Sequence, residues 1–288
     1  MEKENSAMKV GVALGGGGAR GLAHVLALET LDACGIRPTV MAGTSMGAIV
    51  GALYASGQTG KQIRENILSH VITRADRIQD IYDKRDNLFK WLGAVHLSAS
   101  NSGLLNADGF LHYLLAGIHC ETFEALEIPL HVVATDFYRG EAVVFNTGPL
   151  FPAIKASMSI PGIFVPVKHE GKVLVDGGVV NNLPYSFLLD KCDVTIAIDV
   201  APTRIATETK LPSLVDATLG MFDILVDQVT SSMLTMQPPT IYIRPQLIGI
   251  RTLDFEQVEA VFEQAQPAMV ELKEKLAATV GLNSSFTL

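Results

Sequence analysis

GVALGGGGARGLAHVLALETLDACG, residues 11–35, is the stretch that decides the fold of this chain. Residues 8–14 alternate in character and carry two valines, which is typical of a first β-strand. Four glycines at 15–18 end that strand. Residues 21–34 then predict a helix that is apolar nearly all round and ends at Gly35. A strand, a glycine turn and a buried helix in this order indicate an α/β protein.

The same order of elements recurs immediately downstream. Residues 39–42 predict a short second strand, residues 43–47 (GTSMG) a turn, and residues 46–56 a second helix that ends at Gly57. Further strands are expected at 130–135, 142–145, 172–175, 194–200 and 240–244, and further helices at 61–72, 107–115, 152–157, 214–236 and 254–280, the last interrupted by Pro267. Strands that alternate with helices predict a mostly parallel sheet covered on both faces.

Composition excludes several classes of protein. The 288 residues are 48% hydrophobic and only 18% charged, which is too apolar for a disordered chain. The 22 basic and 30 acidic side chains give a net charge of −8, and no run of Lys or Arg occurs. A general nucleic-acid binder would carry a basic stripe, so no nucleic-acid partner is expected.

Cysteine usage and the chain start bear on the compartment. Cys34, Cys120 and Cys192 are far apart and form no CxxC pair, so neither a zinc ribbon nor a disulfide framework is supported. Residues 1–5 are polar, without the apolar core of a secretory signal, and the apolar stretch 40–55 is too short to cross a bilayer. The expectation is a cytoplasmic protein with no metal site.

Two functional interpretations compete for the first glycine loop. Residues 16–21 match G-x-G-x-x-G between a strand and a helix, the context of a Rossmann-type nucleotide site. That site needs an acidic residue at the end of the second strand, which here ends in residues 41–43 (MAG), while Glu29 and Asp32 lie within the preceding helix. The alternative is an oxyanion hole, in which consecutive backbone N–H groups converge at a helix N-terminus. A simple turn needs fewer than four glycines.

The second glycine turn resembles a nucleophile elbow. In GTSMG, Gly43 and Gly47 relieve crowding at a sharp strand–turn–helix, which lifts the Ser45 hydroxyl out of the sheet. The N–H of Met46 would be a further oxyanion donor at the helix start. We expect Ser45 to be a nucleophile.

The base that would activate Ser45 is harder to assign. Asp136 followed by His169 fits the usual order of serine, acid and histidine, but His169 lies in VKHEGK, which predicts an exposed hairpin turn. His24 follows the glycine loop, but its helix position also suits simple packing. Asp176 ends an apolar strand before Gly177, where desolvation would raise its proton affinity. An ordinary Asp-Gly turn explains the same residues, so the motif alone leaves both interpretations open.

Taken in order, the blocks at 16–21, 43–47 and 176–178 resemble the signature blocks of patatin-like phospholipases. The bacterial branch, which also resembles the catalytic domain of neuropathy target esterase, fits best. Residues 134–137 and 156–167 are similar to that family as well. The resemblance implies a three-layer α/β/α sandwich with a largely parallel central sheet. It places a catalytic domain at 8–202, with 203–288 as a mostly helical extension packed on it.

The family resemblance implies a Ser–Asp dyad without histidine, with Ser45 as nucleophile and Asp176 as its base. It also implies an oxyanion hole made by Gly16, Gly17 and Gly18. Arg20 would lie beside that loop, orienting it or meeting a phosphate. The remaining motif glycines would support the turns: Gly43, Gly47, Gly177 and Gly178.

The activity so implied is acyl-ester hydrolysis of a lipid or lysophospholipid, with no cofactor. A Rossmann-type nucleotide protein and a non-enzymatic regulator on the same scaffold are the alternatives. Residues 73–106, with LFKWL at 88–92, suit either a lid over the core or a transient membrane-surface anchor. The helix at 214–236 suits either packing on this chain or pairing with another subunit.

Overall fold

The computed structural model describes residues 8–70, 107–108, 111, 114–115, 117–205 and 211–280. Within these residues, eight strands form one sheet in the order β5-β6-β3-β2-β1-β7-β8, and β4 also pairs with β3. The strands are β1 (Val10–Leu14), β2 (Val40–Thr44), β3 (Leu130–Asp136), β4 (Glu141–Phe145), β5 (Val167–His169), β6 (Lys172–Asp176), β7 (Val194–Ile198) and β8 (Ile241–Ile243).

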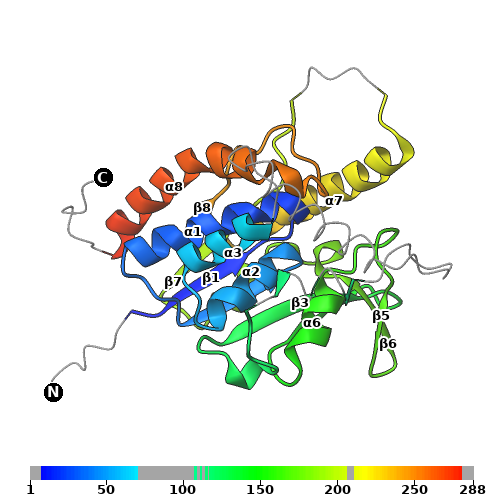
Figure 1. Ribbon diagram of the computed structural model, residues 1–288, viewed down its shortest axis with the longest axis horizontal. Helices are drawn as coiled ribbons and strands as arrows, with labels where there is room; N and C mark the ends of the chain where they lie inside the picture. The colour runs from blue at the N-terminus through cyan, green and yellow to red at the C-terminus, as the bar shows by residue number, and fades with distance from the viewer. Residues whose placement is uncertain are drawn as a thin grey trace.

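Helices cover both faces of the sheet, which makes the three-layer sandwich expected from the sequence (Figure 1). The α-helices are α1 (Ala23–Ala33), α2 (Met46–Ala55), α3 (Gly60–His70), α6 (Leu150–Ser157), α7 (Leu214–Met236) and α8 (Val258–Val280). Short 3₁₀ turns are η1 (Gly18–Leu22), η2 (Phe123–Ala125), η3 (Gly177–Val179), η4 (Pro184–Phe187) and η5 (Phe255–Gln257).

The alternation along β1 separates the two faces of the sheet. Val10, Val12 and Leu14 enter the large core with α1, α2 and α8, whereas Ala13 faces the second, smaller core. Segment η4 and the last turns of α7 form that smaller core. Strands β1, β2, β3, β7 and β8 run parallel, while β4 and β6 run antiparallel to β3. A largely parallel sheet is therefore confirmed.

Two strands that run in opposite directions, β2 and β6, pair with successive parts of one edge of β3. Its first half pairs with β2 up to Thr44↔Val133, and its second half pairs with β6 from Ala134↔Asp176 onward. The opposite edge of β3 is taken by β4. Because β2 and β6 approach along the same edge from opposite sides, their carboxyl ends meet between Val133 and Ala134.

Several expected boundaries are corrected by the structure. Strand β2 spans Val40–Thr44 rather than 39–42, so only Ser45 separates it from α2. The helix expected at 21–34 begins as the 3₁₀ turn η1, in which the Arg20 N–H donates to the Gly17 carbonyl three residues back at 3.2 Å. Helix α8 is continuous through Pro267, where an interruption was expected. Both Pro267 and Glu263 lie on the exposed side of α8, where the unpaired carbonyl can face water.

Other predictions concern segments that are described in part or not at all. Residues 73–106, expected to form a lid or an anchor, lie outside the described residues, as does much of the helix expected at 107–115. The stretch from residue 203 onward supplies α7, α8 and the edge strand β8, which pairs with β7.

A single glycine sets how closely α2 approaches β1. A Cβ atom on Gly47 would lie 2.1 Å from the carbonyl oxygen of Leu14, which is backbone and has no freedom to move aside. We expect Gly47→Ala to lower the free energy of unfolding by about 3 kcal/mol in urea titrations.

Gly220 provides the matched control for Gly47, because it lies inside helix α7 and a Cβ atom added there would have no other atom within 4 Å. Gly220→Ala should be neutral or stabilising by about 0.5 kcal/mol. Equal losses in the two variants would contradict the close approach of α2 to β1.

Candidate active site

Ser45 lies at a strained turn between β2 and α2. Its backbone has φ 54° and ψ −122°, an uncommon conformation for a residue with a side chain. The Ser45 N–H donates to Ser157 Oγ at 2.8 Å, and Ser157 Oγ donates to the carbonyl of Val133 at 2.6 Å. Ser157 of α6 therefore links the Ser45 turn to β3 at the point where β2 ends. No role for Ser157 was predicted from the sequence.

Asp176, the last residue of β6, reaches the same place from the opposite direction. Its side chain is buried, and Oδ1 accepts a hydrogen bond from the Gly178 N–H at 2.7 Å. The Ser45 hydroxyl is close enough to lower the pKa of this carboxyl, but Oδ2 has no partner of regular hydrogen-bond geometry among the described residues. Desolvation outweighs both interactions and raises the pKa of Asp176 to about 6. A half-satisfied, buried carboxylate is suited to accept a proton.

Backbone contacts hold Gly177 and the end of β6 against β3. A Cβ atom on Gly177 would lie 2.1 Å from the carbonyl oxygen of Val133, so only glycine fits there. Thr135 Oγ1 donates to the Asp176 carbonyl at 2.9 Å. These contacts fix the direction in which the Asp176 side chain leaves the strand.

The glycine loop after β1 supplies free N–H groups beside Ser45. Gly16 N–H is already used, because it donates to the Asn182 carbonyl at 3.1 Å, and Asn182 Nδ2 donates back to the Gly16 carbonyl at 3.0 Å. The N–H groups of Gly17, Gly18 and Met46 have no acceptor in the part of the chain that the structure describes. The available donors are therefore at Gly17, Gly18 and Met46, and Gly16 instead ties the loop to Asn182.

Arg20 braces this loop from within the protein. The side chain is only 2% exposed and donates to the carbonyls of Val200 (3.3 Å) and Ile250 (3.1 Å) and to Asp223 Oδ1 (2.8 Å). Desolvation lowers the pKa of Arg20, while Asp223 opposes this shift. Of the two roles expected for Arg20, these contacts favour orienting the loop.

The histidines considered as bases have other surroundings. His24 is fully buried, with Nε2 2.7 Å from the Gly15 carbonyl, and burial lowers its pKa to about 4, so it is neutral at pH 7. His169 ends β5 in the hairpin with β6, as expected, and its ring contacts Phe145. Among the described residues, no histidine lines the cavity at Ser45.

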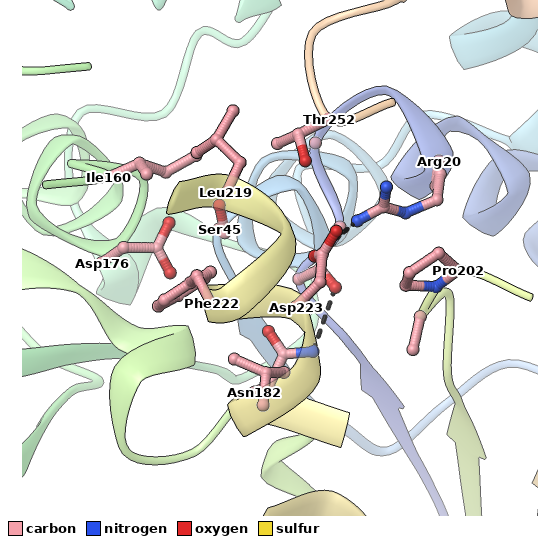
Figure 2. A pocket seen from close by; sticks show the side chains of 15 residues that line it. Arg20, Ser45, Ile160, Asp176, Asn182, Pro202, Leu219, Phe222, Asp223 and Thr252 are labelled. Carbon is pink, nitrogen blue, oxygen red and sulfur yellow. Dashed lines mark hydrogen bonds and ion pairs between the residues drawn. The ribbon is translucent and has the colours of Figure 1, made fainter. Parts of the chain in front are cut away.

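That cavity lies between the glycine loop and α7. Figure 2 shows Ser45 and Asp176 directed into it, with Leu219 and Phe222 of α7 across from them. The lining also includes Gly16, Gly17, Gly18, Arg20, Ile160, Asn182, Ala201, Pro202, Asp223, Val226 and Thr252. Sequence analysis missed Asn182 and the α7 residues. Asp223 and Asp227, four residues apart in a helix that also carries many large apolar residues, were the available signal for α7.

The described residues bear on the expectations for metals and membranes. No group of three or more His, Cys, Asp or Glu side chains arranged to hold a metal ion occurs among them. None of the described helices combines the length and hydropathy needed to cross a bilayer.

The family model described as patatin-like phospholipase matches residues 12–189, which include the glycine loop, Ser45 and Asp176. The chain belongs to the patatin-like phospholipase family. It is 32% identical over 232 residues to uncharacterized NTE family proteins of Mycobacterium bovis and Mycobacterium tuberculosis, covering 76% of this chain and 59% of theirs. It is 31% identical over 214 residues to patatin-like phospholipase domain-containing protein 7 of Rattus norvegicus, covering 73% of this chain and 15% of that protein.

Structural similarity agrees with the patatin-like fold. The chain superposes on VipD from Legionella pneumophila with a TM-score of 0.52 at 16% identity, covering 93% of this chain and 67% of VipD. The chain spans 59% of the length of the mycobacterial relatives. The family model and the relatives above 30% identity establish the family membership of the matched residues.

The pKa of Asp176 gives the stability a distinct pH dependence. At pH values between the pKa of Asp176 in the unfolded chain and its higher pKa in the folded chain, the native state holds a proton that the unfolded state has released. The free energy of unfolding therefore falls as pH rises through this window. Asp176→Asn removes this titration. Its free energy of unfolding should match that of the wild type near pH 4 and exceed it by about 3 kcal/mol above about pH 7. Urea titrations across this range test the shift, and parallel curves for the two proteins would contradict it.

Proposed function

We propose that this patatin-like protein is a serine acyl hydrolase acting on lipid esters, with Ser45 as nucleophile and Asp176 as base. The observation that carries the proposal is the meeting of β2 and β6 on one edge of β3, which directs both side chains into one cavity. The name of one relative gives further support: a protein 24% identical over 300 residues is called lysophospholipase NTE1 in Coccidioides immitis, and this chain covers 18% of it.

In the first half of the proposed reaction, Ser45 Oγ attacks the ester carbonyl carbon and its proton passes to Asp176 Oδ2. The oxygen of the tetrahedral intermediate becomes negative and accepts hydrogen bonds from the N–H groups of Gly17, Gly18 and Met46. The intermediate collapses by breaking the bond to the alcohol oxygen, which takes the proton from Asp176. The acyl group remains on Ser45.

In the second half, water attacks the acyl-Ser45 carbonyl and gives a proton to Asp176. The same three N–H groups stabilise the second oxyanion. Collapse breaks the bond to Ser45 Oγ, which recovers the proton from Asp176, and the fatty acid leaves. Because the raised pKa of Asp176 lies near neutrality, one carboxyl can accept and return the proton in both halves. The mechanism uses no cofactor.

The remaining predicted site residues have positioning roles in this proposal. Gly16 and Arg20 hold the oxyanion loop through Asn182 and Asp223. Gly43 and Gly47 permit the close packing at the Ser45 turn: a Cβ on Gly43 would lie 2.5 Å from the carbonyl oxygen of Gly47. Gly177 and Gly178 likewise permit the close packing at the turn that follows Asp176.

The nucleotide-binding alternative lacks its key contact. Strand β2 ends at Thr44 without an acidic residue to hold a ribose. Asp32 lies on α1, where it accepts hydrogen bonds from the Tyr54 hydroxyl at 2.5 Å and the Gly60 N–H at 2.7 Å. Asp32 is therefore already engaged within the protein and does not replace the missing ribose contact.

Hydrolysis of a panel of phospholipids and lysophospholipids tests the dyad. We expect Ser45→Ala and Asp176→Asn each to reduce kcat/KM by about 10³-fold or more. The nucleophile and its base act together, so the loss of either one removes most of the rate enhancement that the pair provides. His169→Ala is the matched control and should retain wild-type turnover. Retained turnover in either dyad variant would overturn the assignment.

The pH profile of the same reaction gives a second test. Because the base must be ionised, kcat/KM should rise with pH through about 6 and level off above it. A rise centred near the ordinary pKa of a carboxyl, about 4, would contradict a desolvated Asp176 as the base.

A further inference from the structure

The end of helix α6 contacts both members of the proposed dyad. Ser157, the last residue of α6, accepts a hydrogen bond from the backbone N–H of Ser45 on its hydroxyl at 2.8 Å. Two residues later, the carbonyl of Ser159 accepts a hydrogen bond from the backbone N–H of Asp176 at 2.9 Å. We call residues 157–159 the α6 bridge. One short segment therefore connects the residue that follows β2 to the last residue of β6.

Burial and hydrogen bonds fix the α6 bridge on the sheet. The side chains of both its serines are completely buried. The Ser157 hydroxyl donates to the carbonyl of Val133 on β3 at 2.6 Å, and the Ser159 hydroxyl donates to the carbonyl of Lys155 on its own helix at 2.7 Å. Helix α6 itself packs against β3 and β6. The bridge is therefore tied to β3 through a side chain and to β6 through its backbone.

On the Ser45 side, the bridge acts on a strained backbone. The Ser45 carbonyl accepts hydrogen bonds from the N–H groups of Ala48 and Ile49 at the start of α2. Its N–H, on the other side of the residue, donates to Ser157 Oγ. A serine with φ 54° would relax toward a commoner conformation unless both sides were held. Loss of the Ser157 hydroxyl would free the N–H, and the Ser45 side chain would turn with its backbone.

On the Asp176 side, the carboxyl is held by contacts that do not involve the Ser157 side chain. The Asp176 N–H donates to the backbone of the bridge, and its carbonyl accepts Thr135 Oγ1 at 2.9 Å. Its Oδ1 accepts the Gly178 N–H at 2.7 Å. Removal of the Ser157 hydroxyl would therefore displace Ser45 from Asp176 and leave Asp176 in place.

We propose that Ser157 is a positioning residue that keeps the Ser45 hydroxyl against the Asp176 carboxyl. Ser157 is not among the residues that line the cavity, so it acts through Ser45 and does not touch the substrate. Because the α6 bridge holds both members of the dyad, it sets the separation between them. This inference rests on the proposed function, in which the Ser45 proton passes across that separation.

The pKa of Asp176 reports whether the Ser45 hydroxyl is in place. Desolvation raises this pKa to about 6, while the Ser45 hydroxyl and the Gly178 N–H each lower it. The other charged side chains that line the cavity, Arg20 and Asp223, pair with each other at 2.8 Å. Displacement of Ser45 removes one of the two lowering interactions, so the pKa of Asp176 should rise further. A purely structural role of the bridge would leave this pKa unchanged.

The kinetics of Ser157→Ala over a range of pH test the positioning role, with lysophosphatidylcholine as substrate and the wild type measured in parallel. We expect kcat to fall by about 10²-fold with little change in KM, since misplacement of a reacting group slows the chemical step more than binding. The rise of kcat/KM with pH should move above its wild-type midpoint near 6.

Thr30→Ala is the matched control for the loss of a buried hydroxyl. Thr30 Oγ1 donates to the carbonyl of Leu26 within α1 at 2.7 Å, and its side chain is buried. This variant should keep the wild-type kcat and the wild-type pH midpoint. If Ser157→Ala does not fold, Ser157→Cys replaces it, because a thiol of similar size is a weaker donor and acceptor. It should change both quantities in the same direction by a smaller amount.

Urea titrations detect the same shift without any turnover. In Ser157→Ala, the fall of the free energy of unfolding with rising pH should extend to higher pH than in the wild type, because the folded-state pKa of Asp176 is higher. When Asp176→Asn is added to both proteins, this difference in pH dependence should disappear.

The outcomes separate the positioning role from the proposed function. A fall in kcat with an unchanged pH midpoint, or a fall no larger than that of Thr30→Ala, would overturn the role of Ser157. If the wild type hydrolyses lipid esters and Ser157→Ala retains its kcat and midpoint, the proposed function stands and the positioning role fails. If the wild type hydrolyses none, the proposed function fails, and the urea titrations still decide whether Ser157 holds Ser45 against Asp176.

Discussion

The shared edge of β3 is the constraint on which the rest of the site depends. Pairing with β2 ends at Val133 and pairing with β6 begins at Ala134, so two carboxyl ends face each other at one point. Parallel pairing alone would place the ends of neighbouring strands side by side. Here the antiparallel β6 brings Asp176 head-on toward Ser45, the residue that follows β2.

Burial at this junction sets the electrostatics as well as the geometry of the site. The carbonyl of Val133 accepts the Ser157 hydroxyl, and Ser157 in turn holds the Ser45 N–H, which fixes the strained turn. The same apolar surroundings leave Asp176 poorly solvated and raise its pKa to about 6. A site that holds a strained serine and a desolvated carboxylate is less stable than a relaxed one.

Sequence reasoning predicted the local elements well, because each depends on residues close together in the chain. The glycine loop, the Ser45 turn and the hairpin containing His169 all follow from local turn chemistry. The Gly16 donor could not be assessed in this way, because its N–H is occupied by Asn182, 166 residues away. Likewise α7 was predicted with its observed limits, but its inward aspartates depend on Arg20 and Arg244, which only the folded chain brings near.

In the proposed reaction Ser45, activated by Asp176, forms a covalent bond with the acyl carbon of its substrate. Peptide mapping by mass spectrometry after reaction with an alkyl fluorophosphonate tests it most directly, because the reagent phosphonylates an activated serine. We expect one modified peptide, with the adduct on Ser45, and loss of that adduct in Asp176→Asn. An adduct on another serine, or labelling of Ser45 that does not depend on Asp176, would contradict it.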